Sequence, residues 1–135
     1  MNRKISSIVL GGLIGGAFDI AYAIIFSNLR SDAYGGGNPT AALGLGLHFS
    51  MALLWAAGYV VAASRIPLLV RRPVACGAAF GVFVYAFMNL VVIPLSRFPT
   101  KPSYPLAILA TGLFVHMFLF GVPIALASRR AYASA

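Results

Sequence analysis

Residues 73–96, PVACGAAFGVFVYAFMNLVVIPLS, contain no charged side chain. An α-helix rises ~1.5 Å per residue, so a run of this length can cross the ~30 Å hydrocarbon core of a bilayer. Lipid offers no water to the backbone, whereas a helix satisfies its N–H and C=O groups within itself. The stretch therefore predicts a transmembrane helix.

Three further apolar blocks have the same character. They are Ile5–Ser27, Ala41–Ser64 and Pro105–Ser128. Of the 135 residues, 61% are hydrophobic and 9% are charged, and these charges are too few to cover the surface of a soluble domain. The fold class that we predict is all-α: an integral membrane four-helix bundle, built as two helical hairpins in one transmembrane domain over residues 1–135.

The connecting segments are predicted as loops because they contain glycine, proline, asparagine and charges. They are NLRSDAYGGGNPT at 28–40, RIPLLVRR at 65–72 and RFPTKPSY at 97–104.

Most Lys and Arg residues fall at the helix ends that would share one side of the membrane. They are Arg3, Lys4, Arg65, Arg71, Arg72, Arg129 and Arg130, against Arg30, Arg97 and Lys101 on the other side. The positive-inside rule then predicts cytoplasmic termini, and it explains the net charge of +8 without a nucleic-acid partner.

Three features of the sequence bear on alternative interpretations: a cleaved signal peptide, a cysteine-based site and an enzyme. The basic start, the apolar run and Ala-Tyr-Ala at 21–23 resemble a secretory signal, but the apolar run continues through Phe26. We therefore expect a retained helix. A single cysteine, Cys76, excludes a disulfide within the chain and a CxxC metal site. No P-loop and no GxGxxG motif is present, so enzymatic activity is the minority interpretation.

Strongly polar side chains occur inside the apolar blocks, one to a block: Asp19, His48, Asn89 and His116. Counted from the predicted helix ends, all four fall in the outer half of the bilayer or near its middle. A lone carboxylate at such depth costs several kcal/mol, so we expect Asp19 to be neutral, hydrated or paired. We predict that His48 and His116 are its partners, in an intramembrane cluster that also includes Asn89, Tyr22 and Tyr85.

Small residues recur on the helix faces that carry these polar groups. We predict helix packing at Gly11, Gly12, Gly15, Gly16, Gly77 and Gly81. The GxxxG pairs in the first block serve equally for packing within one chain or between copies. Pro94 and Pro123 predict kinks in the third and fourth helices.

Three functions fit this pattern. The leading one is a structural or accessory membrane protein, self-associating as a homo-oligomer or part of a larger complex, in which the polar groups are hydrogen-bonding glue. The second is a transporter or channel for protons, cations or a small solute that uses the cluster as its site. The third is a haem-binding bundle with His48 and His116 as axial ligands. We predict no cofactor and no metal site.

Several segments resemble small, uncharacterised bacterial inner-membrane proteins with four predicted helices, a domain of unknown function. They are FDIAYA (18–23), LGLHF (45–49), RRPVACGAAFGVFVYAFMNLVVIPLS (71–96) and LFVHMFLFGVPIAL (113–126). The resemblance implies a location in the bacterial cytoplasmic membrane and four helices. It implies no catalytic residue.

Overall fold

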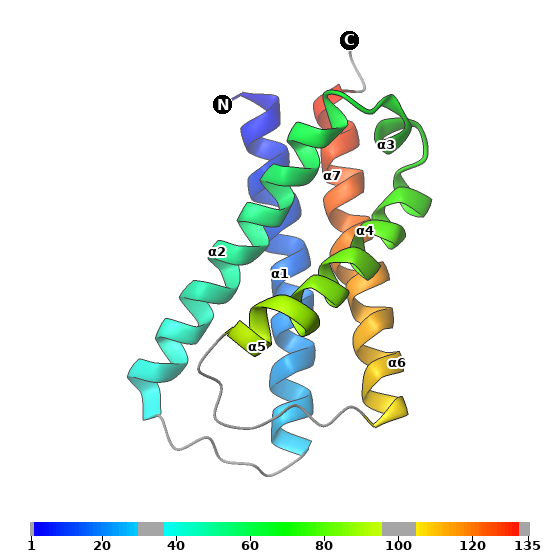
Figure 1. Cartoon of the computed structure of the whole chain (residues 1–135). Helices are drawn as coiled ribbons and strands as arrows, with labels where there is room; N and C mark the ends of the chain where they lie inside the picture. Colours follow the sequence, from blue (N-terminus) through cyan, green and yellow to red (C-terminus); the bar gives the residue numbers. More distant parts are fainter. Residues whose placement is uncertain (1, 30–36, 96–104, 133–135) are drawn as a thin grey trace.

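The computed structural model describes residues 2–29, 37–95 and 105–132, and every regular element in these ranges is helical. Four long helical spans form a bundle (Figure 1). They are α1 (Arg3–Leu29), α2 (Gly37–Ala63), the run α4 (Pro73–Phe87), η1 (Met88–Val92) and α5 (Ile93–Leu95), and the run α6 (Leu106–Phe114), η2 (Val115–Gly121) and α7 (Val122–Tyr132). The predicted all-α four-helix bundle is confirmed, and each span is long and apolar enough to cross a membrane.

The helix ends depart from the sequence prediction in three places. The first helix continues to Leu29 and the second begins at Gly37, so both enter the predicted loop 28–40. The fourth span continues past Ser128 to Tyr132. The loop prediction for 65–72 is wrong for Pro67–Arg71, which forms the short helix α3. Proline fits the first turn of a helix, and Pro67 begins α3 as Pro73 begins α4.

The remaining loop predictions lie outside the described residues. They concern positions 30–36 and 97–104, which include Arg30, Arg97 and Lys101.

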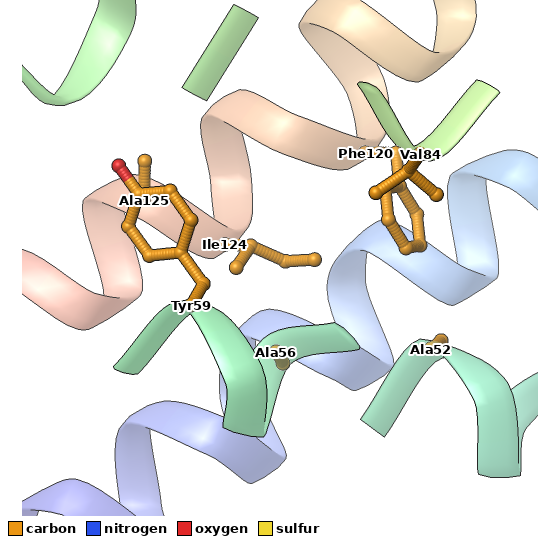
Figure 2. Packing of buried hydrophobic residues seen from close by; sticks show 7 residues of the cluster. All are labelled: Ala52, Ala56, Tyr59, Val84, Phe120, Ile124 and Ala125. Carbon is orange, nitrogen blue, oxygen red and sulfur yellow. The ribbon is translucent and has the colours of Figure 1, made fainter. Parts of the chain in front are cut away.

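The chain forms two antiparallel pairs that meet along α1. Helix α1 packs against α2 on one side and against η2 and α7 on the other, while α4 packs on η2 and α7. Both chain ends and α3 lie at the same end of the bundle (Figure 1). The core at the centre is built from small, branched and aromatic side chains of α2, α4, η2 and α7 (Figure 2). They are Ala52, Ala56, Tyr59, Val84, Phe120, Ile124 and Ala125.

Two π-helical segments, η1 and η2, interrupt the third and fourth spans, and a proline follows each at the second position beyond its end. Proline donates no N–H, and its ring clashes with the carbonyl four residues earlier. That carbonyl belongs to Leu90 for Pro94 and to Leu119 for Pro123, inside the two π-helical segments. The widened turns accommodate both prolines, and the kinks predicted at these prolines take this form.

The outer surface of the bundle is apolar. Leu90, Leu95 and Leu106 are 76–81% exposed. The third span is buried for only 11% of its most apolar window, against 22–28% for the others. Lipid tails are as apolar as leucine, so a surface of this kind can face the bilayer interior without a free-energy penalty. The length and composition of these helices are therefore those of a membrane protein.

The last turn of α7 is tied to α2 by one hydrogen bond. The Tyr132 hydroxyl donates to the Val60 carbonyl at 2.8 Å, and the Lys4 ammonium lies 5.4 Å from the Tyr132 ring centroid. We expect Tyr132→Phe to lower the free energy of unfolding by about 1 kcal/mol, because it removes the hydrogen bond and keeps the ring. Thermal unfolding in detergent measures the loss. A loss as large as that of Tyr132→Ala would mean that the hydroxyl, and not the ring, anchors the helix end.

Candidate functional site

Asp19 on α1 contacts both histidines of the chain. Its Oδ1 lies 3.5 Å from His116 Nδ1, and its Oδ2 lies 3.9 Å from His48 Nε2. The three side chains are only 15–21% exposed, and they come from α1, α2 and η2. The structure therefore brings together the carboxylate and the two imidazoles that the sequence placed in three separate apolar blocks.

Each histidine also has a backbone partner that fixes its tautomer. His48 Nε2 lies 2.9 Å from the Gly16 carbonyl oxygen, and His116 Nδ1 lies 3.0 Å from the Gly112 carbonyl oxygen. A carbonyl only accepts, so these two nitrogens carry the hydrogen and donate it. In the neutral ring the opposite nitrogen then holds a lone pair. His48 Nδ1 and His116 Nε2 are therefore the positions that can accept a proton or ligate a cation.

A small cavity of about 30 Å³ adjoins this cluster. One water needs roughly 10–15 Å³ of such space, so the cavity is large enough for one or two waters, or for one ion. Its walls combine the cluster with aromatic, thioether and aliphatic side chains. They are Asp19, His48, Met51, Ala52, Trp55, Val84, Met88, His116 and Phe120.

The other predicted cluster residues lie nearby but have partners of their own. The Asn89 amide donates to the Tyr85 carbonyl one turn back at 2.8 Å, and Asn89 does not line the cavity. The Tyr85 ring lies edge-on to His116, with centroids 5.0 Å apart. The Tyr22 hydroxyl lies 2.8 Å from the hydroxyl of Thr111. Asn89, Tyr85 and Tyr22 therefore make contacts around the cluster, and none of them lines the cavity.

Trp55 follows His48 by seven residues on α2, so it lies on the same helical face, and it also lines the cavity. Its indole Nε1 is buried without a hydrogen-bond partner among the described residues. Met88 also lines the cavity, and sequence reasoning missed it. Part of the sequence signal was present, because Met88 is adjacent to Asn89 in an uncharged run. Helical periodicity alone, however, did not predict that Met88 and His48 line the same cavity.

Close backbone contact holds His116 in place. A Cβ atom built on Gly81 would collide with the His116 carbonyl oxygen, and one built on Gly77 would lie 2.8 Å from the Gly121 carbonyl oxygen. Only glycine permits helices to approach this closely. The packing role predicted for Gly77 and Gly81 is thus visible as direct contact between α4 and η2.

The glycines of α1 pack within the chain. A Cβ on Gly12 or Gly16 would press on α2, at 2.8 Å from Leu53 Cδ2 and 3.0 Å from Ala52 Cβ. A Cβ on Gly11 or Gly15 would press on the opposite neighbours, η2 and α7. The GxxxG faces are therefore occupied in a single copy, and they give no support to the predicted homo-oligomer.

The cavity beside the two histidines is small for the haem of the third predicted function. The cavity is an order of magnitude smaller than the ~300–1,000 Å³ of ordinary ligand pockets, and both imidazoles approach the same carboxylate. Among the described residues, no group of three or more His, Cys, Asp or Glu side chains is arranged to hold a metal ion. A cation held here would need other ligands as well.

Fold and site together define a class: a four-helix bundle with membrane-spanning character and an internal aspartate–histidine cluster beside a small cavity. Comparison with known proteins does not narrow this class. No family model matches the chain, and neither a curated protein nor a solved structure matches it.

Proposed function

We propose that the protein is a small multi-pass membrane protein that binds a proton or a cation at the centre formed by Asp19, His48 and His116. In this proposal the centre serves a transporter or channel for protons, cations or a small solute. The observation that carries it is the position of one carboxylate within 4 Å of two imidazoles, next to a cavity of ion size.

The electrostatics of the cluster favour a positive occupant. With both imidazoles neutral, the carboxylate of Asp19 is the only charge at the cavity wall. An unneutralised charge inside a bilayer is costly, and intramembrane ionisable residues commonly mark ion paths or proton relays. A proton or a cation next to Asp19 removes that cost.

The proposed setting is a bacterial cytoplasmic membrane with both termini inside. Supporting this orientation, the start of α1, the end of α2 and α3 lie at the same end of the bundle (Figure 1). Arg3 and Lys4 belong to the first turn of α1, and Arg65 lies between α2 and α3. The resemblance to small bacterial inner-membrane proteins supports the location. Four helices leave little room for a pathway in one copy, so transport would require an assembly of copies.

A structural or accessory role is the second candidate, and one observation favours it. The ion-pair contacts of Asp19 link α1 to α2 and to η2, as polar groups that hold helices together would do. Polar interactions between membrane helices are worth about 0.6 kcal/mol on average. Under this alternative, Asp19 contributes to stability and to nothing else.

Flux through proteoliposomes separates the two candidates. Asp19→Asn keeps the shape of the side chain and removes its charge, so we expect proton or monovalent-cation flux to fall at least about tenfold, because the positive occupant loses its counter-charge. Purified protein is reconstituted, and internal pH and Na⁺ or K⁺ are followed with dyes under an imposed gradient.

Ser50→Ala is the matched control. Ser50 lies two residues after His48 on α2, is exposed on the outer surface, and donates only to the Gly46 carbonyl one turn back. The control variant should transport like the unchanged protein. Flux that survives in Asp19→Asn, or the absence of flux in the unchanged protein, would contradict the transport proposal. The structural role would then be the remaining candidate.

A further inference from the structure

We propose that the cavity beside Asp19 binds a soft monovalent metal ion, Cu(I) or its chemical analogue Ag(I). The inference rests on the proposed cation-binding centre and names the class of ion. The geometry that points to it is the convergence on one cavity of the two histidines with two methionine side chains, Met51 and Met88.

The composition of the cavity wall is unusual for this chain. The protein has two histidines, four methionines, one tryptophan and two acidic residues in its 135 positions. Both histidines, two methionines, the tryptophan and one acidic residue line the same space of about 30 Å³. A filler of apolar core would draw on the leucines, valines and alanines that dominate the sequence. The rare side chains gathered here are instead the ones with lone pairs or a π-face.

The donor types select the ion. Thioether sulfur and imidazole nitrogen suit Cu(I), whereas Mg²⁺ and Ca²⁺ need several oxygen ligands. Asp19 is the only oxygen-bearing side chain at the cavity wall. Its single negative charge matches a monovalent ion, so the occupied site is neutral and compatible with a low-dielectric surrounding.

The hydrogen bonds of the histidines fit the same role. A metal-binding histidine usually donates its other ring N–H to a carbonyl or carboxylate, which fixes its tautomer and orientation. His48 and His116 do so toward the carbonyl oxygens of Gly16 and Gly112. The ring nitrogens nearest Asp19 are the ones that carry the hydrogen, so His48 Nδ1 and His116 Nε2 are left with the lone pairs that an ion requires.

Three elements, α2, η1 and η2, position the sulfur and nitrogen donors. On α2, His48, Met51 and Trp55 are spaced by three and four residues, so they share one helical face. Met88 begins η1 and His116 lies in η2, the two π-helical segments. Single π-helical turns occur often at functional sites, because they re-aim side chains that a regular helix would carry elsewhere. The indole of Trp55 adds a π-face that attracts a cation.

Silver is the probe, since Ag(I) is stable in air and has no redox chemistry here. Purified full-length protein in mild detergent is titrated with silver nitrate, and bound metal is counted after desalting. Every variant carries Cys76→Ser, because the thiol lies outside this cavity and would bind silver by itself. Trp55 is the only tryptophan, so quenching of its emission reports occupation of this site. We expect one Ag(I) per chain, with quenching that saturates at the same ratio.

Met51→Leu and Met88→Leu test the donors, since leucine replaces methionine with little change of volume. Each should weaken Ag(I) binding about tenfold or more, and the double variant should remove the quenching. Met117→Leu is the matched control: Met117 is half-buried next to His116 but does not line the cavity, and its replacement should leave binding unchanged.

The outcomes separate this inference from the proposed function. Asp19-dependent flux of protons, Na⁺ or K⁺ without stoichiometric Ag(I) binding overturns the metal inference and leaves the proposed function standing. Silver binding that is equally strong in the Met51→Leu/Met88→Leu variant also overturns it. If the unchanged protein shows neither flux nor silver binding, the proposed function and this inference are both overturned.

Discussion

Gly81→Ala is expected to lower the free energy of unfolding by about 3 kcal/mol or more. Overpacking a filled interior usually costs ~1–3 kcal/mol when side chains can shift. Here the new methyl group would collide with the carbonyl oxygen of His116, which is backbone and has no other rotamer. Either α4 or η2 must move away, and the contacts along the whole crossing weaken with it.

Gly58→Ala provides the matched control on the same bundle. A Cβ built on Gly58 meets no atom within 4 Å, and alanine is a better helix former than glycine by up to ~1 kcal/mol. This variant should be as stable as the unchanged protein or slightly more so. Unfolding in increasing SDS at fixed mild detergent compares the two. Equal stability of Gly81→Ala and Gly58→Ala would contradict the close backbone contact between α4 and η2.

The architecture was predictable because lipid restricts the choice of structure so strongly. A run such as 73–96 without charge has one economical conformation in a bilayer, and four such runs give the bundle directly. The helix ends were less predictable, because proline and arginine at 65–72 signal a loop. The structure instead starts helices at Pro67 and at Pro73, each a proline in a first-turn position. Local composition did not decide between these outcomes.

The centre of the cluster was also predictable, since isolated polar residues in lipid must find one another. Asp19, His48 and His116 meet as expected. Asn89 was a weaker prediction, because an amide can satisfy itself on the carbonyl one turn back, as it does at Tyr85. Met88 was missed because a thioether in an apolar run looks like filler, and because the π-helical turn that begins at Met88 changes the helical phase on which such predictions depend.

Trp55→Ala is expected to lower the free energy of unfolding by about 3 kcal/mol. The indole lies edge-on to three rings of α4, with centroid distances of 6.1 Å to Phe80, 5.8 Å to Phe83 and 5.3 Å to Phe87. Such pairs contribute ~0.5–1.5 kcal/mol each beyond their buried area. Because α4 approaches η2 and α7 more closely than it approaches α2, these rings carry much of the contact between α2 and α4.

Two further variants identify what the indole contributes. Leu54→Ala removes the adjacent side chain, which is 64% exposed on the outer surface and should cost little because lipid replaces it. Trp55→Phe keeps an aromatic ring but fills less volume, whereas removal of the unpartnered Nε1 recovers part of that cost, so its loss should be about 1 kcal/mol. The same SDS unfolding assay ranks all three variants. A loss in Trp55→Ala no greater than that in Leu54→Ala would mean that the indole does not hold α2 against α4, and that α2 is held by α1, α3 and α7. The side of the cavity that Trp55 shares with Met88 would then be open to lipid, and a site that must exclude lipid around its ion could not form there.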